Sequence, residues 1–393
     1  MISLGEQITV AELEDDPYPI YARLRAEAPV AWVPAVEMWL ATTWDAALRV
    51  ASEPELFAAD MPGSPIERSF GSPTILTCDG ERHRELRRSI DPKYRPHEVG
   101  AYIEDLVGPI VAEQLEKLDA SSEVDLMADY FEPISVLSLG AVLGLGDISA
   151  DTLRGWFAAL ADGATNFERD PDKQARSDAA SAEIDDRLAP LLDHLEREPD
   201  DSTISHMIHS GREPGDPRPR EAYMPTLKVI LLGGMQEPGH GAGSVLYALL
   251  THPEALDEVT GDLDGKLPAA IDEGMRWIAP IGTQGRRTTQ EVELEGVTLP
   301  ADAPVAAVVA SANRDPARFD DPDSFDLDRD RRRLATFGFG RHFCSGHAFA
   351  RAQERIALRA LLRRWPRLEL AGDVPFSGWE FRAPRELRVR LPE

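Results

Sequence analysis

A glycine-rich loop near the C-terminus holds the residue best suited to metal chemistry. It reads Phe337-Gly338-Phe339-Gly340-Arg341-His342-Phe343-Cys344-Ser345-Gly346 and leads into a helical pattern from about Ala348 to Leu362. Glycines let a flat group approach the backbone closely, and the amino end of the following helix stabilises a thiolate. Two interpretations are open: a core cysteine in an ordinary loop, or a thiolate bound axially to a metal, as haem iron can be.

The loop resembles the haem-binding signature of the cytochrome P450 family, Phe-x-x-Gly-x-x-x-Cys-x-Gly, with Phe337, Gly340, Cys344 and Gly346 at its fixed positions. The resemblance extends over nearly the whole chain. It implies haem b (iron-protoporphyrin IX) as cofactor, Cys344 as the iron ligand, and contacts to the haem from Phe337, Gly338 and Gly346. It also implies the fold, which is mainly α with small β-sheets (α+β). In that fold a triangular prism of helices holds the haem between a long distal helix and the proximal cysteine loop.

The same resemblance assigns the residues that hold the haem propionates. His83 and Arg87 stand four residues apart in a helical pattern and therefore share one face. By itself such a basic run indicates a solvated face. In the family a His-x-x-x-Arg at this point binds a propionate, and an arginine fork suits a carboxylate. Arg286, with Arg287 as the alternative, and His342 complete the implied set.

The chain departs from the family in a long apolar helix, predicted from about Tyr223 to Thr251. Most relatives carry an acid followed by threonine above the haem, whereas this chain has Gln236 and Glu237. In the alternative register Glu237 takes the acid position and Pro238 the alcohol position, and the threonine is absent in both. Glu237 is either a general base above the iron, oriented by Gln236 through hydrogen bonds, or a group that points away and only tolerates dioxygen chemistry.

Two further sets of residues complete the predicted site. Glu273 and Arg276 have the spacing of a common solvated helix pair, but their distance from the cysteine resembles the buried Glu–Arg pair that anchors the family's proximal fold, a structural role. The resemblance also implies a substrate pocket formed by Phe70, Ile75, Leu76, Phe167, Leu232, Gly233, Ala279, Pro280, Ile281 and Trp379.

The elements that must position these residues are mostly helical by apolar periodicity. No linker or composition break divides the chain, which predicts one domain over residues 1–393. The expected elements are a helix at 16–26, a short hairpin at 31–41, a long loop at 57–76, two helices within 101–145, a helix at 151–163, another ending near 198, and a strand hairpin at 292–297.

Composition excludes several classes of partner. The 42 basic residues face 69 acidic ones, a net charge of −27, which argues against nucleic acid or an anionic membrane as a partner. Cys78 and Cys344 are the only cysteines, so no disulfide framework is implied and a reducing compartment fits. No apolar run reaches transmembrane length. These features predict a cytoplasmic protein, which we expect to be a monomer.

Three functions are weighed. The Gln-Glu-Pro-Gly run resembles a small P450 subgroup that uses hydrogen peroxide to O-demethylate methoxylated aromatics such as syringol and guaiacol, releasing formaldehyde. The alternative is a monooxygenase that hydroxylates or dealkylates a small hydrophobic substrate and receives electrons from a ferredoxin and its ferredoxin reductase. A basic patch would then dock the ferredoxin; its members are Arg84, Arg88, Arg341 and Arg355. A non-catalytic haem carrier is disfavoured by a Glu beside the distal face.

Overall fold

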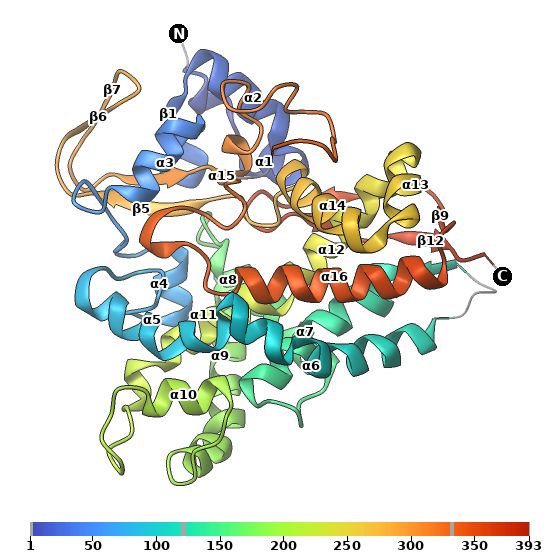
Figure 1. The fold of residues 1–393 in the computed structure, drawn as a ribbon. Coiled ribbons are helices and arrows are strands. Elements are labelled where there is room, and N and C mark those ends of the chain that lie inside the picture. The colour runs from blue at the N-terminus through green and yellow to red at the C-terminus, as the bar shows by residue number, and fades with distance from the viewer. Residues whose placement is uncertain (1–2, 119–122, 331–333, 393) are drawn as a thin grey trace.

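The structure, a computed structural model, describes residues 3–118, 123–330 and 334–392. Its described residues are mainly helical with small sheets (Figure 1), which confirms the predicted fold class. The helices are α1 (Val10–Asp15), α2 (Pro17–Glu27), α3 (Trp44–Ser52), α4 (Pro65–Phe70), α5 (Gly80–Tyr94), α6 (Pro96–Lys117), α7 (Glu132–Leu143), α8 (Ala150–Ala164), α9 (Pro171–Leu195), α10 (Thr203–His209), α11 (Met224–Met235), α12 (Glu237–Thr251), α13 (Pro253–Gly261), α14 (Leu263–Trp277), α15 (Val309–Ala312) and α16 (His347–Arg364).

The strands form short sheets that join distant parts of the chain. They are β1 (Val30–Val33), β2 (Met38–Ala41), β3 (Phe57–Ala58), β4 (Glu123–Asp125), β5 (Gln284–Thr288), β6 (Val292–Leu294), β7 (Val297–Leu299), β8 (Pro304–Ala307), β9 (Glu369–Leu370), β10 (Phe376–Ser377), β11 (Ala383–Pro384) and β12 (Arg388–Arg390). The largest described sheet has the order β1-β2-β8-β5-β3. It therefore joins the N-terminal hairpin, as predicted for residues 31–41, to β8, and β8 pairs on its other side with β5, the strand that carries Arg286.

Helix α16, which follows the cysteine loop, lies across the middle of the molecule (Figure 1). It packs against α6, α12 and α14. Phe349, Leu358 and Leu361 of this helix belong to the largest buried apolar cluster. The predicted helix at 348–362 is thus confirmed, and its packing fixes the loop before it relative to α12.

The prediction of one long helix from about Tyr223 to Thr251 is wrong in one respect. The helix is broken at Gln236, which separates α11 from α12. Pro238 has no N–H to continue the helical ladder. The N–H of the next residue, Gly239, turns to the Oγ of Ser135 at 3.2 Å instead of to the helix. Two successive helical hydrogen bonds are thereby lost, and Glu237 begins a new helix.

The long loop predicted at 57–76 also needs correction, since it contains β3 and α4. Helix α4 begins with a favourable cap: the Ser64 Oγ accepts a hydrogen bond from the Glu67 N–H, and Pro65 occupies the first turn. The predicted hairpin at 292–297 is confirmed as β6 and β7. No helix among the described residues is long and apolar enough to cross a membrane.

Glu273 and Arg276 form a buried ion pair that joins α14 to the irregular chain before the cysteine loop. Two hydrogen bonds of 2.8 Å link the carboxylate to Arg276 Nε and Nη2, and both side chains are inaccessible to solvent. Arg276 also donates to the carbonyls of Asn313 and Ser324, and Glu273 accepts from Arg329. The pair therefore satisfies backbone groups that no regular element would satisfy.

We predict that Glu273→Gln destabilises the protein by about 3–5 kcal/mol, because it leaves the Arg276 charge buried and unneutralised. The free energy of unfolding of the haem-loaded protein in denaturant measures this loss. Glu113→Gln is the matched control, since the Glu113–Lys117 pair is more than half exposed and contributes about 0–1 kcal/mol. Equal losses in both variants would contradict a special role for the buried pair.

Candidate functional site

The cysteine loop is held in a tight turn by glycines and by backbone hydrogen bonds. Gly338 and Gly340 have φ of 74° and 67°, in the left-handed region. A Cβ on Gly340 would lie 2.7 Å from the carbonyl oxygen of Ala51. The Cys344 N–H donates to the Phe337 carbonyl at 3.0 Å. The loop thus fixes the position of the thiol through its backbone.

The Cys344 thiol lies near several charged groups. Burial raises its pKa, while the Gly346 N–H and the charges of Arg87 and Arg351 act in the opposite direction. The Glu237 carboxyl lies near enough to raise the pKa of the thiol further. The residue nevertheless has accessible surface. The Cys344 thiol and the Glu237 carboxyl therefore lie near enough to interact electrostatically, although they come from different elements, the loop before α16 and the start of α12.

Three of the predicted propionate residues come together beside this loop. The rings of His83 and His342 are 4.1 Å apart. Burial lowers the pKa of His83 to about 4 and also lowers the pKa of His342, despite its hydrogen bond to Asp79. Burial lowers the pKa of Arg286 to about 10. At pH 7 the histidines are neutral and Arg286 remains charged.

Strand β5 separates Arg286 from the alternative, Arg287. Successive side chains of a strand point to opposite faces, so the two arginines face different surroundings. Arg286 is 4% exposed, whereas Arg287 pairs with Asp60 at 2.9 Å and with Asp302 at 2.5 Å. The structure therefore brings Arg286 to the histidine cluster and leaves Arg287 in ion pairs on the other face.

Arg87 takes a different position from the other three. Its Nε donates to Asp91 at 2.9 Å and its Nη1 donates to the Phe343 carbonyl at 2.7 Å. Asp91 also accepts from the Ser345 hydroxyl at 2.8 Å. Arg87 thus ties helix α5 to the cysteine loop, and its charge also contributes to the lowered pKa of His83.

Glu237 is a buried carboxyl without a neutralising partner. Neither of its oxygens has a hydrogen-bond partner among the described residues. Burial raises its pKa to about 8, an effect that the neighbouring N–H groups of Gln236 and Glu237 only partly offset. Its place in the first turn of α12 puts it at the positive end of the helix dipole. No hydrogen bond joins the Gln236 and Glu237 side chains in the described structure, so the orienting role of Gln236 stays a prediction.

His240 is a site residue that the sequence analysis missed. It lies one turn after Glu237 on α12, and burial lowers its pKa to about 4. Its ring packs edge-on against Phe157 at 5.7 Å, and Phe157 packs against Phe381 at 6.2 Å. Its Nδ1 has no partner among the described residues. The sequence did contain a signal for His240, because it follows the candidate base Glu237 by three residues and therefore lies on the same face of the helix.

The predicted substrate-pocket residues fall into two buried groups. Phe70, Ile75 and Leu232 belong to the large helical cluster. Ala279 and Trp379 belong to a second cluster beneath the N-terminal sheet, with Phe167 packed against it; the Phe167 and Trp379 rings are 5.3 Å apart. Pro280 is buried and Ile281 partly buried, whereas Leu76 and Gly233 are exposed.

Comparison with known proteins identifies the class. The family model described as Cytochrome P450 matches residues 223–374. The chain is 30% identical to 6-deoxyerythronolide B hydroxylase of Saccharopolyspora erythraea over 411 residues, covering 98% of this chain and 99% of that protein. It is 31% identical to the cytochrome P450 monooxygenase PikC of Streptomyces venezuelae over 370 residues, 91% of this chain and 86% of PikC. The chain belongs to the cytochrome P450 family, whose members are oxidoreductases that bind haem b.

Solved structures agree in fold. P450BioI, in complex with an acyl carrier protein ligated to hexadec-9Z-enoic acid, matches with a TM-score of 0.88 and 23% identity, covering 97% of this chain and 100% of that one. CYP109E1 from Bacillus megaterium, in complex with testosterone, has a TM-score of 0.87 and 23% identity over 98% of this chain and 100% of that one. At these identities the likeness concerns the fold alone.

The residues present fit a haem b group. Arg286 Nη2 and His83 Nε2 are buried donors without partners in the described structure, as an anionic propionate would need. Gly233, on α11, is exposed, and a Cβ built there meets no atom within 4 Å, which leaves room beside the helix for a flat group. We infer that Cys344 would supply the thiolate ligand to the iron of such a group.

We predict that Cys344→Ser abolishes the red-shifted Soret band of the reduced carbonyl complex, because only a thiolate ligand gives that shift. Difference spectroscopy of the reduced, carbon monoxide-treated protein measures it. Cys78→Ser serves as the matched control and should keep the band, since burial raises the pKa of Cys78 to about 11 and its thiol donates to the Thr74 carbonyl. An intact band in Cys344→Ser would rule out the ligand assignment.

We predict that Arg286→Ala weakens haem retention, because removing a donor to a buried charge costs on the order of 1–3 kcal/mol. Transfer of haem to apomyoglobin measures the rate of loss, which should rise by about tenfold or more. Arg287→Ala changes the neighbouring residue on the opposite face of β5 and should leave the rate unchanged. The inverse result would assign the propionate to Arg287. His83→Ala and Arg87→Ala extend the same measurement to the helix α5 donors.

Proposed function

We propose that this P450 is a hydrogen peroxide-driven peroxygenase that O-demethylates small methoxylated aromatics such as syringol and guaiacol. The observation that carries the proposal is the buried Glu237 carboxyl, which no charge or hydrogen bond occupies in the described structure. Its charge lies near enough to the Cys344 thiol to raise the pKa of that group. A positioned carboxylate can accept and return a proton, which the threonine hydroxyl of most relatives cannot do near neutral pH.

In this proposal Glu237 transfers a proton between the two oxygens of hydrogen peroxide. In its ionised form one Oε takes the proton from one oxygen of hydrogen peroxide and delivers it to the other oxygen, so that the O–O bond breaks and water leaves. Thiolate-bound haem, when present, supplies the oxidising chemistry and favours O–O cleavage. The raised pKa of about 8 suits this role, because a base whose pKa lies near the working pH both takes up and releases its proton.

The remaining oxygen atom is transferred to the substrate's methoxy methyl group. A C–H bond of ArOCH3 becomes C–OH, giving the hemiacetal ArOCH2OH, and this breaks down to ArOH and formaldehyde. The balance is ArOCH3 + H2O2 → ArOH + CH2O + H2O. The neutral His240, one turn after Glu237, packs against Phe157, which in turn packs against Phe381. Mostly apolar walls of this kind favour a small aromatic substrate.

A ferredoxin-dependent monooxygenase is the second candidate function, favoured by the likeness to the monooxygenase PikC. The predicted docking patch gives it weaker support, because its arginines already have acidic neighbours. Arg84 and Arg88 both pair with Glu81 at 2.7 Å, and Arg355 lies 3.5 Å from Glu104. Arg341 lies 3.7 Å from Asp79. These carboxylates reduce the positive charge available to an acidic ferredoxin.

We predict that Glu237→Gln lowers peroxide-driven demethylation by roughly 10²–10⁴-fold, the usual contribution of a general base. Glutamine keeps the size of the side chain and removes its ability to take a proton. Formaldehyde release with syringol or guaiacol and peroxide alone measures the rate. Glu237→Thr should lose activity to a similar extent, while the spin-state shift on substrate binding stays nearly intact in both variants.

Two results would separate the candidate functions. Glu132→Gln is the control for a buried glutamate away from the site, since Glu132 pairs with Arg154, and it should keep its peroxide activity. If Glu237→Gln retains full peroxide activity, the peroxygenase proposal falls. Turnover that needs ferredoxin, reductase and NADH, with none on peroxide, would favour the monooxygenase instead.

We predict that the peroxide-driven rate rises with pH through an inflection near 8. Burial raises the pKa of Glu237 to about 8, so the carboxyl is mostly protonated at pH 7 and becomes the active base as the pH increases. The ionised fraction grows about fivefold between pH 7 and pH 8 and then levels off. Rates of formaldehyde release across this range, measured at saturating substrate, should follow this curve. A flat profile, or the same inflection in Glu237→Gln, would contradict the assignment.

A further inference from the structure

A cavity lies apart from Cys344 and Glu237. It has a volume of about 390 Å³ and is bounded by α2, α12, the end of α14, the chain after α15 and the β10–β11 hairpin. This volume lies within the roughly 300–1,000 Å³ typical of small-molecule sites. Its lining includes Tyr247, ten residues after Glu237 and therefore about 15 Å further along α12. Neither Cys344 nor Glu237 lines it.

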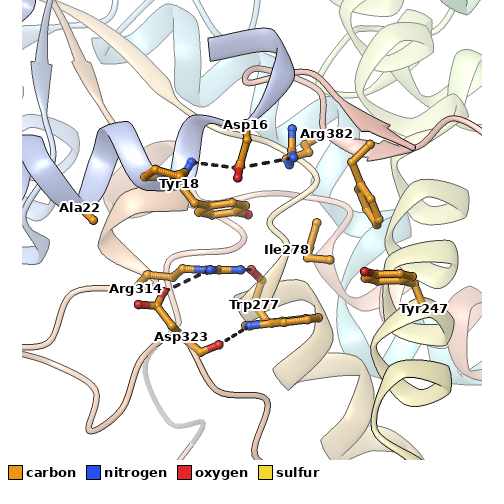
Figure 2. Close-up of a pocket in the computed structure, with 11 residues that line it drawn as sticks. Asp16, Tyr18, Ala22, Tyr247, Trp277, Ile278, Arg314, Asp323 and Arg382 are labelled. Carbon is orange, nitrogen blue, oxygen red and sulfur yellow. Dashed lines mark hydrogen bonds and ion pairs between the residues drawn. The ribbon is translucent and has the colours of Figure 1, made fainter. Parts of the chain in front are cut away.

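Four aromatic rings surround this cavity. Figure 2 shows Tyr18 on one side and Trp277 on the other, with Ile278 between their levels and Tyr247 beside it. The Tyr247 and Trp277 rings lie nearly parallel, at 12°, with centroids 6.4 Å apart. Phe376 packs edge-on against Tyr247 at 4.9 Å. The hydroxyl oxygen of Tyr247 points toward Ile278 (Figure 2). Flat rings at such angles offer faces and edges to a planar ligand.

Two arginines already occupy the positions that a cation would take. The Arg314 guanidinium lies 3.8 Å from the ring centre of Tyr18 and 5.5 Å from that of Trp277. The Arg382 guanidinium lies 5.7 Å from the rings of Tyr18 and Phe376. Because the protein's own cations fill these faces and would repel another, the cavity does not suit an ammonium ligand.

The balance of charge favours an anion. Arg314 and Arg382 are 11% and 9% exposed, whereas their carboxylate partners Asp323 and Asp16 are 68% and 52% exposed. Solvent screens exposed charges more strongly than buried ones, so the positive heads dominate inside the cavity. Arg382 Nε donates to no residue in the described structure, because the hydrogen bonds of Arg382 use Nη1 and its ion pair uses Nη2. A donor thus remains for a ligand carboxylate.

We propose that this cavity is a second binding site, for a small planar aromatic carboxylate. The aromatic ring of the ligand packs against the accessible edges and faces of Trp277, Tyr247 and Phe376, and its carboxylate turns toward Arg382 and Arg314. The site goes beyond the proposed oxidation, because no step of that reaction uses these residues.

The test uses haem-loaded protein whose haem site is filled with 4-phenylimidazole, so that binding elsewhere is measured. The probe is 4-fluorobenzoate, followed by fluorine NMR line broadening. We expect saturable binding that Tyr247→Leu weakens about threefold to tenfold, through the loss of one ring contact. Trp32→Leu, which removes an exposed aromatic residue on β1, is the matched control and should bind as the parent does.

Two comparison ligands test the chemical class. Trans-4-fluorocyclohexanecarboxylate, which keeps the charge without the aromatic ring, and 4-fluorobenzylamine, which keeps the ring and reverses the charge, should both bind at least tenfold more weakly than 4-fluorobenzoate. Equal binding of the amine would overturn the assignment to an anion. The second site itself is overturned if 4-phenylimidazole abolishes 4-fluorobenzoate binding, or if Tyr247→Leu binds as tightly as the parent.

Discussion

The structure around the start of α12 depends on one constraint, which is that the Glu237 carboxyl is buried without a neutralising charge among the described residues. Glu237 can occupy that position because α12 starts at this residue, with Pro238 unable to donate and Gly239 bonded to Ser135. The amino end of α12 gives it a favourable dipole, yet burial still raises its pKa to about 8. Since the folded state binds this proton more tightly than the unfolded chain, its contribution to stability is lost as the pH rises from about 4.5 toward 8.

The opposite side of the site is held by backbone constraints. The cysteine loop depends on left-handed glycines and on the hydrogen bond from Cys344 to Phe337. The chain before it is irregular, and its carbonyls are satisfied by Arg276 from α14. Loop and ion pair therefore form one rigid support. The two sides meet through α16, which packs on both α12 and α14.

The sequence predicted the parts of this arrangement that depend on local residue types. The glycine spacing around Cys344 required the turn that is observed, and apolar periodicity located α8, α9 and α16. Arg286 and Arg287 could not be separated from the sequence, because the choice depends on which face of β5 is buried. The break at Gln236 was missed because apolar residues continue on both sides of it, although Pro238 was a visible signal. Helix α4 was missed because its six residues are too few to show a period.

The cavity around Trp277 could not be predicted, because each contributing segment has an ordinary local explanation. Tyr18 lies in an N-terminal helix, Arg314 in an irregular loop and Phe376 in a two-residue strand. Taken alone, each of these three residues has the pattern of an ordinary core or surface residue. Only the tertiary fold places the two guanidiniums against the rings, and only burial decides that these cations outweigh their exposed carboxylate partners. The electrostatic potential in this cavity is therefore positive only in the folded structure, because solvent screens the exposed carboxylates more strongly than the buried guanidiniums.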